Sequence, residues 1–341
     1  MTYYVTTILV YFGVDALAIW GLNVQYGLCG LYNFAFILFQ SLGAYTAAVL
    51  TLGPASGNGG YQHYVLGASL PFPLPLIAAG LAGAGLGIVL GLLTRRVGAD
   101  LMAVLTFVVS VMAVLVVSAV IPLFNGPAGL SSVPAPLQST FHISYSSYPW
   151  FFVGVVAVVC AIALISVRAL TNSPLGRAMR AIRENEKACS ALGKNVAGLK
   201  LFAFAYGGAL IGVSGALLVM FIGAWSPGSW EVIETLSAFA AIIIGGTGNN
   251  YGVVAGVFVT QIFLTELTRF LPQFSATNLI GSMQWIVIGV LTLAFMWFRP
   301  RGIFPERKRV IELDRLDPSE SRSHDLGSST AGRSQEAQKS Q

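Results

Sequence analysis

The polar residues of this chain that could bind a small solute lie at two breaks in long apolar runs. Near the first break are five hydrogen-bonding side chains: Asn23, Gln25, Asn33, Gln40 and Ser41. The second break is a stretch of six residues: Gly245, Gly246, Thr247, Gly248, Asn249 and Asn250. Polar groups inside membrane segments are costly and often functional, and broken helices commonly line transport paths. Both groups are therefore candidates for a translocation path, although a Gly-Asn cluster also forms tight turns, and we favour a turn at the second break.

The residue types needed for catalysis or metal binding are scattered. The histidines and cysteines are spread along the chain, with no CxxC pair: His63, His142, His324, Cys29, Cys160 and Cys189. This spacing indicates neither a metal site nor a disulfide framework. The sequence also lacks the GxxxxGK[ST] motif of a P-loop. We therefore expect no enzyme and no cofactor bound by this chain, and ATP-driven transport would need a separate ATPase.

The composition indicates a membrane protein with a polar tail. Of the 341 residues, 55% are hydrophobic and 10% are charged, whereas a soluble domain carries about 25% charged residues. Residues 1–298 are expected to form a transmembrane domain. Residues 299–341 hold about half of the charges and are expected to form a largely disordered cytoplasmic tail, which begins with a membrane-surface anchor, RPRGIFPERKR. The net charge of +5 does not indicate nucleic-acid binding, because the basic residues form no patch beside aromatic residues.

Apolar runs of about 20 residues predict membrane helices. Nine candidate segments are present: 4–22, 31–52, 74–93, 101–124, 149–170, 201–224, 230–247, 251–269 and 281–298. The expected fold is an all-α integral membrane protein, a polytopic bundle of about nine spans with eight to ten possible. Small residues repeat at four-residue spacing and predict close helix packing: Gly83, Gly87 and Gly91; Gly208, Gly212 and Ala216; Gly252 and Gly256.

The basic residues predict the orientation of these segments. Eighteen of the 19 Lys and Arg residues fall at Arg95 with Arg96, between residues 168 and 200, and after residue 298. Cytoplasmic loops are enriched in Lys and Arg, and an even number of predicted spans separates the three places. The C-terminus is therefore expected in the cytoplasm. Nine spans would put the N-terminus outside, and this side depends on how the first two segments are divided.

The basic connection from Arg168 to Lys200 has the pattern of a short amphipathic helix. Thr171, Asn172 and Ser173 offer N-cap oxygens. Pro174 suits a first turn, and Gly193 could end the helix in a left-handed cap. One face of the predicted helix, from 174 to 192, carries Met179, Ile182, Cys189 and Leu192. Such a helix could dock into a groove of a partner or lie on the membrane surface.

Several motifs resemble a known family. Residues 176–218, GRAMRAIRENEKACSALGKNVAGLKLFAFAYGGALIGVSGALL, are similar to the matching segment of the Liv-type permease subunits of branched-chain amino acid ABC importers, especially the LivM type. GLNVQYGLCGLYNFAF, FNGPAGL, IIIGGTGNNYGVVAGVFV and FRPRGIFPE resemble further blocks of that family. The resemblance extends over about residues 15–305. Family members usually have a His where this chain has Phe36, which puts inheritance of leucine, isoleucine and valine as substrates in question.

The resemblance implies an importer in the bacterial cytoplasmic membrane. Its partners would be two ABC ATPase subunits that use ATP and Mg²⁺, a sister permease of the LivH type, a periplasmic or extracellular substrate-binding protein, and membrane lipid. Residues 171–200 would form the cytoplasmic coupling loop. Its expected ATPase contacts are Arg180, Glu184, Glu186, Ala188, Gly193 and Asn195, and Arg180 could instead pair with Glu184 at i,i+4 spacing. The alternative function is a secondary transporter or channel for a small polar solute, which buried acidic residues on several helices would favour; Asp15 is the one clear carboxylate near the middle of a predicted span.

Overall fold

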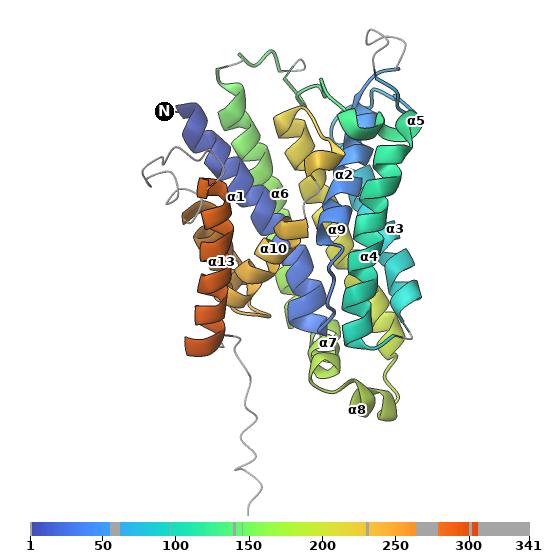
Figure 1. Cartoon of the computed structure of the whole chain (residues 1–341), viewed down its shortest axis with the longest axis vertical. Coiled ribbons are helices and arrows are strands. Elements are labelled where there is room, and N and C mark those ends of the chain that lie inside the picture. Colours follow the sequence, from blue (N-terminus) through green and yellow to red (C-terminus); the bar gives the residue numbers. More distant parts are fainter. Residues whose placement is uncertain are drawn as a thin grey trace, which may run out of the picture. The chain divides into compact units, whose positions relative to one another are not determined.

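The computed structural model describes residues 2–54, 62–95, 97–138, 141–144, 146–229, 232–263, 279–299 and 302–305, and this part of the chain is helical (Figure 1). Its main helices are α1 (Thr2–Asn23), α2 (Phe36–Thr51), α3 (Leu74–Thr94), α4 (Ala99–Ala119), α6 (Tyr148–Asn172), α9 (Val196–Ile222), α10 (Val232–Gly245), α11 (Asn250–Val257) and α13 (Leu279–Phe298). Shorter helices are α5 (Ile121–Phe124), α7 (Pro174–Glu184), α8 (Glu186–Ala191), the π-helices η1 (Val24–Leu28) and η5 (Phe258–Phe263), and two 3₁₀ turns. The expected all-α fold is confirmed.

Each of the nine predicted segments contains an apolar helix. Within the described residues, five helices have the length and composition of a membrane span: Tyr3–Leu28, Leu74–Thr94, Leu101–Ala119, Tyr148–Asn172 and Val196–Ile222. Four apolar helices are shorter: Phe36–Thr51, Ile233–Gly245, Asn250–Phe263 and Trp285–Phe298. The end of the eighth predicted segment, from residue 264 to 269, lies outside the described residues.

The second segment begins later than predicted, because the chain between Cys29 and Ala35 is not a regular helix. Its backbone finds partners inside the bundle. The Leu31 N–H donates to the Gln25 carbonyl at 2.9 Å, and the Phe34 N–H donates to Thr106 Oγ1 at 3.0 Å. Irregular backbone at membrane depth is tolerated when its polar groups are satisfied by protein. Hydrophobicity alone could not locate this break, since Leu31 and Phe34 are apolar.

The helices alternate between two ends of the bundle. Figure 1 shows the start of α1 and α5 at one end, and α7, α8 and the last turn of α13 at the other. The end of α3, the connection from α6 to α9 and the end of α13 therefore share one end of the bundle. This arrangement agrees with the even spacing of basic sites in the sequence, and this is the end expected to face the cytoplasm.

Helix α9 is the centre of the bundle and packs against α1, α2 and α3. The contact with α3 depends on the predicted small-residue repeats, because a Cβ at Gly83 would collide with the Gly208 carbonyl. A Cβ at Gly43 of α2 would likewise collide with the backbone of Gly212. Helix backbones that approach this closely gain van der Waals contact over their whole length.

Replacing Gly83 by Ala should destabilise the bundle, because the added methyl group has to separate α3 from α9. Overpacking of this kind costs about 1–3 kcal/mol. Gly85, on the same helix, has no neighbour within 4 Å of its would-be Cβ, so Gly85→Ala should leave stability unchanged or raise it slightly. Thermal unfolding of the two variants in detergent checks this difference, and equal melting temperatures would contradict the packing described here.

Candidate functional site

The connection between α6 and α9 forms two helices where one was predicted. Ser173 caps α7 by accepting from the Gly176 N–H at 3.2 Å, as expected. The chain then becomes extended at Asn185, whose side chain caps α8 by accepting from the Ala188 N–H at 3.0 Å. Asn residues favour caps over helix interiors because their side chains compete for backbone donors. The predicted left-handed cap at Gly193 is confirmed by its φ of +73°.

The break at Asn185 changes which side chains face the bundle. Met179, Ile182 and Cys189 are buried, as the periodicity predicted. The prediction for Leu192 is wrong: its side chain is 79% exposed. Because the chain breaks at Asn185 and α8 starts in a new direction, the helical periodicity of α7 does not predict which side chains at the end of α8 face the bundle.

Five of the six predicted coupling residues are exposed on this end of the bundle: Glu184, Glu186, Ala188, Gly193 and Asn195. Arg180 is half-buried, and its pairing with Glu184 stays a prediction. Glu184 Oε1 lies 3.5 Å from Arg183 Nη2, and Glu186 Oε1 accepts from Lys200 Nζ at 2.6 Å. Asn195 caps α9 by accepting from the Gly198 N–H at 2.9 Å. The loop is therefore fixed by caps and buried side chains and still presents a polar surface outward.

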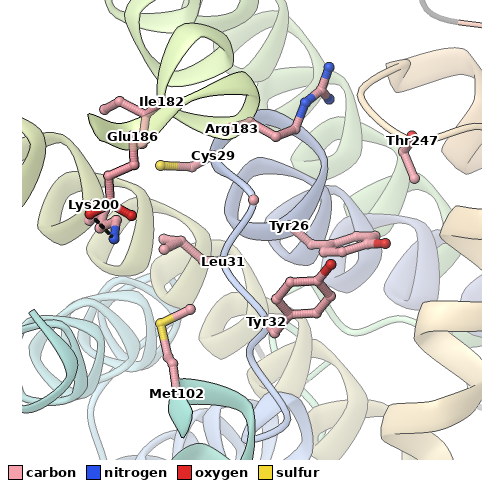
Figure 2. Close-up of a pocket in the computed structure, with 11 residues that line it drawn as sticks. Tyr26, Cys29, Leu31, Tyr32, Met102, Ile182, Arg183, Glu186, Lys200 and Thr247 are labelled. Atoms are coloured by element: carbon pink, nitrogen blue, oxygen red, sulfur yellow. Dashed lines mark hydrogen bonds and ion pairs between the residues drawn. The ribbon is translucent and has the colours of Figure 1, made fainter. Parts of the chain in front are cut away.

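A cavity of about 330 Å³ lies between this loop and residues 26–32, which follow α1. Figure 2 shows Tyr26 and Tyr32 together on its wall, with the Glu186–Lys200 pair on the opposite side and Cys29 between them. Thr247 is the predicted path residue that lines it. Its lining combines charged, hydroxyl and apolar groups.

Two of the predicted path residues form one buried network. Asn33 Nδ2 donates to Gln25 Oε1 at 2.7 Å, and Gln25 Nε2 donates to the Phe204 carbonyl at 3.2 Å. Asn33 Oδ1 also accepts from the Ala35 N–H at 3.0 Å. These bonds connect the irregular segment 30–35 to α9, so both amides have a structural role.

The remaining path residues of the first group lie elsewhere. Gln40 and Ser41 are buried on α2, where a Cβ at Gly215 of α9 would collide with the Gln40 carbonyl. Asn23 is buried at the end of α1, and its Oδ1 accepts from the Gly248 N–H at 3.0 Å. The structure thus joins Gln25 with Asn33 and Asn23 with the second break, while Gln40 and Ser41 sit apart on α2.

The second break is a tight turn, as favoured from the sequence. Helix α10 ends at Gly245 and α11 begins at Asn250, with positive φ at Gly246 and Gly248. The helices pack closely, because a Cβ at Gly245 would collide with the Gly252 carbonyl. Asn249 caps α11 by accepting from the Tyr251 N–H at 3.0 Å.

Two further features of this region were not predicted. Residues 302–305 pack on the α10–α11 turn: the Ile303 N–H donates to the Ile244 carbonyl at 2.9 Å and the Phe304 N–H donates to the Gly245 carbonyl at 3.0 Å. The start of the expected surface anchor is therefore bound to the bundle here, and the tail from Glu306 lies outside the described residues. The apolar residues of the GIFP sequence at 302–305 were the feature of the sequence that could have indicated this packing.

The second unpredicted feature is an aromatic cluster beside the cavity. The Tyr26 ring lies 5.2 Å from that of Tyr32 and 5.3 Å from that of Phe239, and the Phe34 ring stacks on Phe239 at 4.9 Å. The cluster connects η1, the irregular segment 30–35 and α10. A search for polar residues inside apolar runs could not find it.

Comparison with known proteins agrees with this architecture. The family described as branched-chain amino acid transport system / permease component matches residues 4–296. The high-affinity branched-chain amino acid transport system permease protein LivM of Salmonella typhimurium is 28% identical over 86% of this chain and 68% of its own length. The probable branched-chain amino acid transport permease protein LivM of Methanocaldococcus jannaschii is 25% identical over 89% of this chain and 94% of its own length.

A shorter similarity concerns a sugar system. The xylose transport system permease protein XylH of Escherichia coli is 32% identical over 37% of this chain. No solved structure matches the chain.

Proposed function

Because the chain belongs to the branched-chain amino acid transport system permease family and is a membrane permease subunit of an ABC importer, we propose that it passes a branched-chain or related amino acid into the cytoplasm. Transport would be driven by separate ATPase subunits. The membrane concerned would be the bacterial cytoplasmic membrane.

The observation that carries the proposal is the two-sided character of the α7–α8 connection. Met179 and Ile182 are buried against the bundle, while the surface from Glu184 to Asn195 is exposed apart from Cys189. A loop that receives force from a partner needs both a rigid seat on the membrane domain and a free outer face. A helix that merely lies on the membrane would instead direct its apolar face to lipid.

The proposed partners supply functions of an ABC importer that this sequence does not provide, such as ATP hydrolysis. Two ABC ATPase subunits with bound ATP and Mg²⁺ would bind beneath the paired permease subunits, with the α7–α8 surface as the contact that this chain provides, since the chain has no P-loop. A LivH-like permease subunit would pair with this one in the membrane. A substrate-binding protein would deliver solute at the opposite end.

The substrate class is tested by uptake competition in proteoliposomes that contain the complete complex. Labelled leucine should accumulate only with ATP, and unlabelled isoleucine or valine should reduce its uptake more than xylose or urea. Competition by xylose alone would instead favour a sugar. Phe36, at the start of α2, is 5% exposed. If this position shapes the substrate site, Phe36→His should change the order of the competitors, and an unchanged order would assign Phe36 to packing.

A further inference from the structure

Arg183, in the last turn of α7, contacts the π-helix η1 that follows α1. Its Nη1 donates to the carbonyl oxygen of Gly27 in the π-helix η1. A Cβ at Gly30, whose φ is +73°, would lie 3.1 Å from Arg183 Cγ. The side chain of Arg183 therefore lies directly on the backbone of residues 27–30.

The Gly27 carbonyl is available as a hydrogen-bond acceptor for a side chain of a neighbouring helix. It lies near the end of η1, where helix carbonyls lack partners within the helix. The guanidinium group stays protonated at all relevant pH values, and its hydrogen bonds are charge-assisted. π-Helices inside α-helices occur frequently at functional sites.

The same π-helix holds the α10–α11 turn. Asn23, the last residue of α1 and the N-cap of η1, accepts from the Gly248 N–H, and a Cβ at Gly27 would lie 2.7 Å from the Gly248 nitrogen. Tyr26, one residue before Gly27, contacts Tyr32 and Phe239 in the aromatic cluster. A displacement of Gly27 would therefore move both the turn and the cluster beside the cavity.

We propose that Arg183 is the positioning residue that transmits motion of the α7–α8 loop to η1, and from there to the α10–α11 turn. The proposal rests on the proposed function, because it needs an ATPase that moves the loop. The proposal gives Arg183 a different role from the outward-facing residues of the loop. Those residues would contact the ATPase, whereas Arg183 contacts η1 in the membrane domain. Arg183 also lies 3.5 Å from Glu184, but the Glu184 side chain is 62% exposed, so solvent screens this pair and it contributes little to stability.

The test compares Arg183→Met with Arg177→Met in the complete reconstituted complex. Arg177 is exposed on the same helix and donates to the Asn172 carbonyl within its own connection, so its replacement removes an equal charge without touching η1. Arg183→Met should lower solute uptake per ATP hydrolysed at least tenfold while ATPase subunits stay bound. Arg177→Met should stay within twofold of the wild type, and Arg183→Lys should recover part of the loss.

Hydrogen exchange provides a second readout, and its first comparison needs only the wild-type complex. In the wild-type complex, a non-hydrolysable ATP analogue should change amide exchange in residues 23–30, and this response should be lost in Arg183→Met. No response in the wild type would overturn the proposal even if Arg183→Met fails to assemble. An unchanged uptake-to-hydrolysis ratio in Arg183→Met would also overturn it, whereas absence of ATP-driven uptake in the wild type would instead refute the proposed function.

Discussion

Replacing Leu192 by Asp should weaken binding of the partner ATPase by tenfold or more, with the permease itself still folded. Leu192 is 79% exposed at the end of α8, beside Gly193 and Asn195 of the expected coupling surface. Burying a leucine side chain at an interface contributes about 1.5–3 kcal/mol, so loss of that contact corresponds to tenfold weaker binding or more. The dissociation constant between the detergent-solubilised permease pair and the ATPase measures the effect.

Leu175→Asp is the matched control for this prediction. Leu175 is also an exposed leucine of the loop, but it lies at the start of α7, away from the coupling surface. Its replacement should leave the dissociation constant within about threefold of wild type, which corresponds to the near-neutral majority of interface positions. Equal weakening by both substitutions would mean that a general negative charge, and not an anchor at Leu192, explains the result.

Replacing Asn33 by Leu should strongly destabilise the bundle and abolish uptake. The change removes the bonds of Asn33 to Gln25 and to the Ala35 N–H, and leaves their partners buried without replacements. Each unsatisfied buried group costs about 1–3 kcal/mol, which should lower the melting temperature by several degrees.

Gln62→Leu provides the comparison, because Gln62 makes a similar two-bond contact in an exposed loop. Its Nε2 donates to Ser131 Oγ at 2.7 Å and its Oε1 accepts from the Ser131 N–H at 3.2 Å. Water can replace these bonds, so the loss should stay within about 0.5 kcal/mol. If Asn33→Leu abolishes uptake with an unchanged melting temperature, Asn33 acts on the solute and not on the bundle.

Local rules predicted much of this fold. Apolar runs located all nine helical segments, since each needs only its own composition to be recognised. The Ser173 cap and the left-handed Gly193 cap followed from residue types that backbone geometry selects at helix ends. The Gly83 repeat predicted the close contact between α3 and α9, because only the absence of a Cβ permits it.

Features that depend on distant contacts could not be predicted in this way. The π-helix after Asn23 is accompanied by contacts from Gly248 and Arg183, which lie far away in the sequence. The aromatic cluster requires Phe239 to meet Tyr26, and the packing of residues 302–305 on α10 is equally remote. The exposure of Leu192 followed from the cap at Asn185, which a single helical periodicity over residues 174–192 did not include.

The most direct test of the central claim is uptake by reconstituted subunits with one component omitted at a time. Proteoliposomes with this chain, the sister permease, the ATPase and the binding protein should accumulate labelled leucine in an ATP-dependent manner, and omission of the ATPase should reduce uptake to background. Gradient-driven uptake by this chain alone, without any ATPase, would contradict the account and support a secondary transporter or channel.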